Sequence, residues 1–274
     1  MAAQPYRIRL FGGFVVEKPT GELERSLSRP RAQAMFAVLA VSGPLGCTRD
    51  RLMHLLWSDK DQERARHSLR DTLYALRAVV GADALTGQGE TLRLSGARVD
   101  SDVQRFTEAL KAGRAEEAVD LYRGPLLHGF HLGDAPQFER WLDAERARLL
   151  RERQQAAKQL ARRAEREERW DAAADWWGRA VELDPCNSRL VVRRMVALTH
   201  AGDRANAIAE GEAHRDLLRT ELDLEPDAAF VETLVWVRGG GGPVQFFTPW
   251  PPRPHPDDPR RSAQPPEDAG GSAR

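Results

Sequence analysis

The sequence predicts a mainly α-helical protein, in which a smaller α+β part at the N-terminus precedes an all-helical part. Residues 1–98 combine short stretches of alternating polarity with three helical patterns, whereas residues from Asp100 onward are rich in Ala, Leu, Glu and Arg and have few glycines. The chain has 274 residues and 41% apolar content, so it can form two ordinary domains with substantial cores.

Short strands are expected at both ends of the N-terminal part. Residues 6–14 alternate charged and apolar side chains, which is the pattern of a half-buried strand. Val15, Val16 and Leu23 are expected to continue a small antiparallel sheet. Apolar residues between glycines then predict a β-hairpin that consists of Leu85, Thr91, Leu92, Leu94 and Val99.

Three helices are predicted between these strands. The first, residues 31–42, has an apolar stripe at helical spacing, and the second, residues 48–57, begins at the candidate N-cap Thr48. The third, residues 63–80, ends at Gly81. The order of strands, three helices and hairpin is the plan of a winged helix-turn-helix, whose third helix enters the DNA major groove.

The third predicted helix has a basic outer face. Its apolar residues fall within one arc of a helical wheel: Ala65, Leu69, Leu73, Leu76 and Val80. The opposite side carries the candidate DNA contacts Arg64, Arg66, His67, Arg70, Tyr74 and Arg77. Arginine can bond a guanine edge or neutralise a phosphate, and tyrosine and histidine can reach phosphate or sugar. Any amphipathic helix also turns charged side chains outward, which is the alternative explanation.

Asp71 lies on the same outer face and does not suit contact with phosphate. A carboxylate in the major groove fits only a cytosine amino group or a neighbouring arginine. The other expected role of Asp71 is to orient His67 or Tyr74.

Charge is unevenly distributed along a chain whose formal net charge is zero. Residues 1–98 hold 15 Lys/Arg against 10 Asp/Glu, residues 99–238 hold 22 against 27, and residues 239–274 hold 4 against 4. A basic part in front of an acidic one favours binding of a polyanion by the N-terminal part. Together with the winged helix-turn-helix plan, this distribution makes double-stranded DNA the expected partner.

One turn-then-helix pattern recurs in the second part of the chain. Residues 112–118, 168–174 and 201–207 are variants of it, and the last two are offset by 33 residues, close to the 34 of a tetratricopeptide repeat. We therefore predict a tetratricopeptide-like helical-repeat domain over residues 99–238, with a groove for a protein segment. A generic helical hairpin is the alternative.

The last segment differs in composition. Residues 239–274 begin with four glycines and continue with a Pro-rich sequence, which predicts a disordered tail. Docking of the segment around Trp250 is the alternative to a plain unstructured end.

The sequence offers little for catalysis, metal binding or membrane insertion. No apolar run approaches the roughly 20 residues that span a bilayer, and the start lacks the pattern of a secretory signal, so a cytoplasmic location is expected. Cys47 and Cys186 have no CxxC spacing, and the histidines have no HExxH spacing. A GxxxxGKS or GxxxxGKT phosphate loop is also missing. We therefore expect neither enzymatic activity nor a cofactor or metal.

Motifs in both parts of the chain carry a family resemblance. In the N-terminal part they are residues 7–14 (RIRLFGGF), 52–57, 64–70 and 76–77, and in the second part residues 118–127 (AVDLYRGPLL), Phe130, Phe138-Glu139, Trp141-Leu142 and Glu145-Arg146. On these residues the chain resembles the SARP-type (Streptomyces antibiotic regulatory protein) transcription factors. That family joins an OmpR-type winged helix to a bacterial transcriptional activator domain.

The resemblance implies a transcriptional activator of antibiotic or other secondary-metabolite gene clusters. Such a protein would bind promoter repeats, form a homodimer on tandem sites and help to recruit RNA polymerase through its repeat domain. The resemblance carries the six third-helix residues over as DNA contacts and adds Arg93 of the hairpin as a minor-groove or phosphate contact. Asp71 and the modest charge surplus keep one alternative open, a protein-interaction scaffold with a degenerate winged helix.

Overall fold

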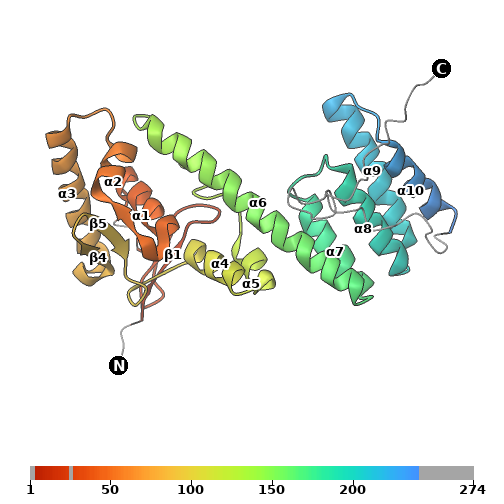
Figure 1. Cartoon of the computed structure of the whole chain (residues 1–274), viewed down its shortest axis with the longest axis horizontal. Coiled ribbons are helices and arrows are strands. Elements are labelled where there is room, and N and C mark those ends of the chain that lie inside the picture. Colours follow the sequence, from red (N-terminus) through yellow and green to blue (C-terminus); the bar gives the residue numbers. More distant parts are fainter. Residues whose placement is uncertain (1–3, 25–26, 241–274) are drawn as a thin grey trace, which may run out of the picture.

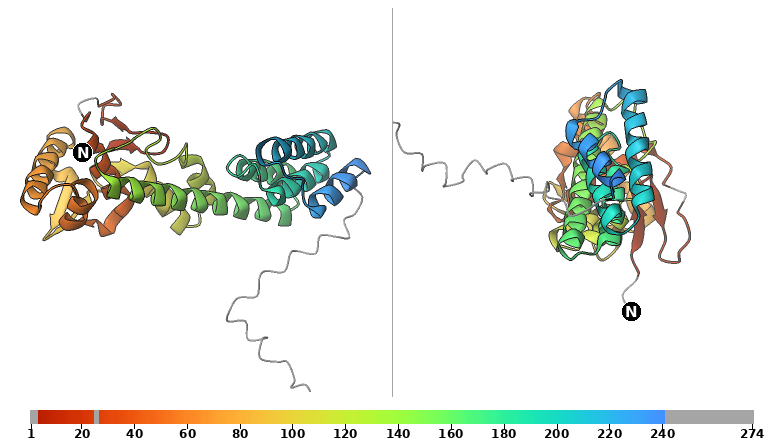
Figure 2. Two further views of the ribbon diagram at one scale, coloured as in Figure 1. Left: turned by 90° about the horizontal axis from the view of Figure 1, so that it is seen from above. Right: turned by 90° about the vertical axis from the view of Figure 1, so that its right-hand side faces the viewer.

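The computed structural model describes residues 4–24 and 27–240, and in this part the protein is mainly helical, as the sequence predicts. The described molecule is elongated: the N-terminal elements lie at one end, the last helices lie at the other, and one long helix connects them (Figures 1 and 2). The expected tail, residues 239–274, lies almost entirely outside the described residues.

The N-terminal part contains two small sheets. In the first, β1 (Tyr6–Arg9) pairs antiparallel with β2 (Val15–Glu17) and parallel with β6 (Val99–Ser101). In the second, the order is β3 (Cys47–Thr48), β5 (Thr91–Leu94) and β4 (Leu85–Gln88), and both pairings are antiparallel.

The predicted strands are confirmed with one correction. Val15 and Val16 lie in β2, and Leu23 forms a bridge to Glu17, so the small antiparallel sheet is present. The hairpin β4–β5 is also present. The prediction that Val99 continues this hairpin is wrong, because the chain turns at residues 95–98 and Val99 pairs instead with Tyr6.

The three predicted helices are present as α1 (Pro30–Ser42), α2 (Arg49–Leu56) and α3 (Gln62–Val80). Side chains cap two of them: Thr48 Oγ1 accepts a hydrogen bond from the Arg51 N–H at 3.2 Å, and Asp61 Oδ1 accepts one from the Arg64 N–H at 2.9 Å. Such caps satisfy amides that have no partner within the helix.

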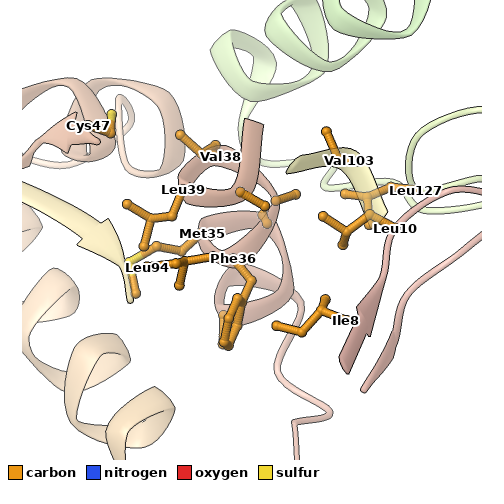
Figure 3. Close-up of a cluster of buried hydrophobic side chains, with 14 of the residues drawn as sticks. Ile8, Leu10, Met35, Phe36, Val38, Leu39, Cys47, Leu94, Val103 and Leu127 are labelled. Atoms are coloured by element: carbon orange, nitrogen blue, oxygen red, sulfur yellow. The ribbon is translucent and has the colours of Figure 1, made fainter. Parts of the chain in front are cut away.

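Helix α1 is the centre of the N-terminal core. Met35, Phe36 and Leu39 are fully buried in it. Figure 3 shows these side chains between Leu94 of β5 on one side and Ile8 of β1 on the other. The two sheets are therefore joined through α1, although they share no strand.

The core of the N-terminal part continues beyond residue 98. Helices α4 (Asp102–Lys111) and α5 (Ala115–Leu121) follow β6, and Phe106 of α4 packs edge-on against Phe11 at a centroid distance of 5.4 Å. The Asp102 carboxylate accepts hydrogen bonds from the N–H groups of Leu10 and Phe11 at 2.9–3.0 Å. One connected set of buried side chains runs from Ile8 to Leu149.

The loop after α5 is attached to the beginning of the chain. Leu127 N–H donates to Leu10 O at 2.8 Å, and Gly12 N–H donates to Pro125 O at 3.0 Å. The guanidinium of Arg146 then donates to the carbonyls of Leu126 and Leu127, both at 2.8 Å. This loop therefore joins the first strand to the helix that carries Arg146.

That helix, α6 (Pro136–Arg166), has 31 residues and is about 45 Å long at 1.5 Å per residue. Its first half contributes Phe138, Leu142 and Leu149 to the N-terminal core, and its second half contributes Ala157 and Ala161 to the next core. Figure 1 shows it running from α2 to α7 (Trp170–Val181). It is thus shared by both parts of the molecule.

Antiparallel helices complete the molecule: α8 (Ser188–His200), α9 (Arg204–Leu222) and α10 (Ala228–Arg238) stack beyond α7 (Figure 1). Three turns, α4–α5, α6–α7 and α8–α9, have the same hydrogen bonds. In each, a backbone N–H donates to the carbonyl five residues earlier: Arg114 to Ala109, Arg169 to Ala164, and Asp203 to Leu198, at 2.8–2.9 Å. The recurrence predicted from the sequence is therefore one turn geometry used three times.

Candidate nucleic-acid interface

Helix α3 separates an apolar face from a polar one. The buried residues of α3 are those that the wheel predicts: Ala65, Leu69, Leu73, Leu76 and Val80. The predicted contacts on the other face are all exposed: Arg64, Arg66, His67, Arg70, Tyr74 and Arg77. Figure 1 shows α3 at the end of the molecule away from α8–α10. The exposed face is therefore free of contact with the helical array.

Three arginines of this face form no ion pair among the described residues: Arg66, Arg70 and Arg77. Tyr74 lies between the last two along the helix and is 78% exposed, which is unusual for a large aromatic side chain. Arg70, Tyr74 and Arg77 are spaced four and three residues apart, so they share one side of α3. These three side chains are all exposed, and neither arginine has an ion-pair partner among the described residues.

The first turn of α3 is less available. Arg64 Nε lies 3.2 Å from Asp61 Oδ2, and Asp61 also caps the helix through its other carboxylate oxygen. Both side chains remain largely exposed, so this ion pair contributes little to stability and can exchange partners. The pair uses Nε of Arg64, and the other N–H donors of this exposed guanidinium can still contact a phosphate.

Asp71 contacts His67, which was one of the two roles expected for it. His67 Nε2 lies 3.2 Å from Asp71 Oδ2, one helical turn away. The carboxylate is thereby directed along the helix toward His67. Asp71 therefore acts on a neighbouring side chain of its own helix.

The structure does not bring Arg93 together with the α3 residues. Arg93 is exposed on β5 between the buried Leu92 and Leu94, and it lines a shallow pocket with Gln104 and Glu108 of α4. The pocket side of the hairpin faces α4. The carboxylate of Glu108 at this pocket opposes the approach of a phosphate to Arg93.

Lys60 is a cationic side chain near α3 that the helical wheel could not predict, because it lies outside the helix. It lies in the turn before α3, and its Nζ donates to Ser68 Oγ at 2.9 Å. Its position depends on the path of the turn and not on helical periodicity. The only local signal is a lysine next to the N-cap Asp61.

The turn that precedes α3 is attached to α1 and to the start of α6. The guanidinium of Arg31 in α1 donates to Leu56 O at the end of α2 and forms an ion pair with Asp134, just before α6. Arg31 also lies 5.7 Å from the ring centroid of Trp57. These contacts make Arg31 a positioning residue for the turn between α2 and α3.

The described part of the chain contains no group of three or more His, Cys, Asp or Glu side chains able to hold a metal ion. None of its helices has the length and apolarity needed to cross a membrane.

Comparisons with known proteins agree with the fold. Residues 104–234 match the family model described as bacterial transcriptional activator domain. Among solved structures, one of Mycobacterium tuberculosis EmbR in complex with a low-affinity phosphopeptide matches with a TM-score of 0.57 and 18% identity. The match covers 88% of this chain and 66% of the EmbR chain. No curated protein matches the sequence significantly.

The family model covers α4 to α10 almost completely, and the likeness to EmbR extends to the N-terminal elements. At 18% identity this likeness concerns the fold, which is a small N-terminal α+β part followed by stacked helices. The match to the family model supports a bacterial transcriptional activator domain in residues 104–234, and the likeness to EmbR supports the arrangement of the elements.

Proposed function

We propose that this protein is a sequence-specific, DNA-binding transcriptional activator that acts in the cytoplasm. In this proposal α3 binds the major groove of promoter repeats, and the helical-repeat domain helps to recruit RNA polymerase to a secondary-metabolite gene cluster. The observation that carries it is the exposed face of α3, where Arg66, Arg70 and Arg77 form no ion pair among the described residues.

The roles of the α3 residues follow from their positions. Arg70 and Arg77 are two turns apart, about 10 Å, which corresponds to three base-pair steps of about 3.4 Å. Both can therefore reach base edges in one major groove, with Tyr74 between them against a thymine methyl group or a sugar. Arg64, Arg66 and Lys60 lie nearer the start of the helix and are assigned to phosphates.

Promoter binding is tested with the full chain. DNA selected from a random pool by the wild-type protein provides the binding site, and affinity is then measured over a range of salt concentrations. Arg70→Ala and Arg77→Ala should each weaken specific binding about tenfold or more, because one base contact contributes about 1–3 kcal/mol. Arg162→Ala, which removes the same charge from the outer side of α6, should leave affinity unchanged. Equal affinity for all three variants and the wild type would contradict the proposal.

A basic stripe on α6 supports a protein partner. It consists of Arg151, Lys158, Arg162 and Arg166, which lie on one side of the helix and form no ion pair among the described residues. Residues 154–164 of α6 contain no Asp or Glu, although residues 99–238 are acidic overall. The stripe fits an acidic surface of RNA polymerase by charge complementarity.

The partner role is tested by charge reversal. Lys158→Glu combined with Arg162→Glu should reduce transcription from the selected promoter while leaving DNA affinity at the wild-type value. Lys111→Glu, on the exposed side of α4, is the control and should leave transcription unchanged. Normal transcription with the double variant would show that the basic stripe does not contact the polymerase.

The stoichiometry of binding tests the homodimer. On DNA with two tandem repeats, two copies should bind side by side, and the second copy should be lost when one repeat is deleted.

The competing function, a scaffold with a degenerate winged helix, is favoured by the Arg64–Asp61 and His67–Asp71 pairs, which reduce the free charge of α3. Failure to select any DNA sequence, together with retained binding to a protein partner, would establish the scaffold instead.

A further inference from the structure

Exposed apolar side chains gather at the end of the helical array. Of the seven large hydrophobic residues exposed in the described chain, four lie between the end of α9 and the end of α10: Leu222, Leu224, Val231 and Val235. Val231 and Val235 are one turn apart on α10 and are 48% and 63% exposed. Isolated exposed apolar residues are common, but this concentration in one short stretch is not.

Helix α10 is the last helix of the stack. It packs on α8 and α9 through Phe230, Leu234 and Val237, which are buried together with Val191 and Met195 of α8. A terminal helix of such an array normally presents a polar outer face, because no further repeat covers it. The outer side of α10 presents two valines, Val231 and Val235, beside the charged residues Glu232 and Arg238.

We propose that residues 243–250 of the same chain, which lie outside the described residues, bind the face of α10 formed by Val231 and Val235. This segment reads PVQFFTPW and contains Phe246, Phe247 and Trp250. Residues 239–252 contain no charged side chain. Three aromatic residues in a short uncharged stretch are typical of a segment that packs against an apolar surface.

The connection allows the chain to reverse direction at this point. Four glycines, residues 239–242, follow α10 directly, and glycine adopts the backbone conformations that a sharp reversal needs. From Gly240, the six residues to Phe246 span up to about 20 Å when extended. Helix α10 has 11 residues and is about 16 Å long, so the aromatic side chains can reach both valines.

A segment attached by a short linker has an advantage over other occupants. Its effective concentration at the face of α10 is in the millimolar range, well above that of a second copy of the protein in solution. We therefore assign the face to this segment and not to self-association. The inference does not depend on DNA binding or on a polymerase contact.

Photo-cross-linking of the full chain tests the contact directly. Benzoylphenylalanine in place of Phe247 should cross-link to residues 228–238 of the same molecule, and the product should have the mass of one chain. The same group in place of Gln264, beyond the segment, is the control and should give no cross-link to α10. Cross-links between two chains would assign the face to a second copy and overturn the proposal, as would cross-links scattered over the surface.

Amide hydrogen exchange provides the second measurement. Phe246→Ser, Phe247→Ser and Trp250→Ser combined should increase exchange in residues 228–238 about tenfold while leaving α3 unchanged. Val231→Ser with Val235→Ser alters only exposed positions, so the fold should persist while the cross-link from position 247 is lost. Unchanged exchange in the triple variant, or a retained cross-link in the double variant, would refute the inference.

Discussion

His214 is a buried titratable side chain whose two ring nitrogens both have partners. Nδ1 lies 3.0 Å from Pro185 O, and Nε2 lies 2.9 Å from Ser188 Oγ. The carbonyl can only accept, so Nδ1 carries the proton and Nε2 accepts from the serine. Burial lowers the pKa of His214 below its usual value, against smaller opposing effects from the Pro185 hydrogen bond and the charges of Asp227 and Glu210.

This lowered pKa predicts acid sensitivity of the helical array. Between the unfolded value of about 6.5 and the lower folded value, the unfolded chain binds the proton more tightly, so folding stability decreases as the pH falls. Above about pH 6.5 the full contribution of His214 is present. Urea unfolding at pH 7.5 and 5.5 should show a smaller loss of stability for His214→Asn than for the wild type. Parallel pH profiles of the two proteins would exclude this role for His214.

The positions of some side chains near α3 could be predicted from the local sequence, and those of others could not. The contact between Asp71 and His67 follows from their spacing of four residues on one helix, and the sequence already suggested it. The place of Lys60 depends on the path of a turn, and the neighbours of Arg93 depend on which element packs beside its hairpin, so neither follows from the helical period. For this reason the helical wheel missed Lys60, and the expected minor-groove or phosphate contact of Arg93 rested on the family resemblance alone.

At the scale of elements, the three equivalent turns contain one unfavourable residue. The residue with positive φ is Gly113 in the first turn and Gly202 in the third, at 73° and 87°. In the second turn it is Glu168, with φ of 54°. A side chain in this left-handed region costs about 1–2 kcal/mol, whereas glycine adopts it without strain.

Glu168→Gly should therefore stabilise the protein. Removing the backbone strain stabilises the folded state by more than the about 0.4–1 kcal/mol that is lost because glycine makes the unfolded chain more flexible. The free energy of unfolding should therefore increase by about 0.5 kcal/mol. The midpoint of thermal unfolding should increase by about 1–2 °C. Gly202→Ala, at the equivalent position of the third turn, is the matched control and should lower the midpoint. A lower midpoint for Glu168→Gly would show that the turns are not equivalent in energy.

At the scale of the whole molecule, α6 couples the N-terminal part to the helical array. Its side chains enter the first core up to Leu149 and the second from Ala156 onward. The first core also includes α4, α5 and the loop held by Arg146, so a cut after Arg98 would remove β6 and Asp102 from their contacts with β1 and Leu10. We therefore propose that the N-terminal part, which the sequence bounds at residues 1–98, needs the following segment for its stability.

A break in the middle of α6 should separate the two parts. Gln155 is exposed and lies between the segments that enter the two cores, and proline there costs about 3 kcal/mol or more because it removes a helical hydrogen bond and clashes with the preceding turn. Calorimetry of Gln155→Pro should show two unfolding transitions, whereas Gln155→Ala should unfold as the wild type does. One cooperative transition at lower temperature for Gln155→Pro would mean that the coupling does not pass through α6.

Features of this protein that depend on neighbouring residues could be predicted from its sequence. The two faces of α3 follow from the helical period, and the recurring turns follow from a repeated local pattern. Three features became known from the folded structure alone: Val99 pairs with Tyr6, the loop before α6 binds Leu10 and Gly12, and one helix contributes to two cores. These contacts join residues that are far apart in the chain. The backbone N–H and C=O groups of each strand or loop need a hydrogen-bond partner, and no local sequence pattern identifies the distant segment that provides it.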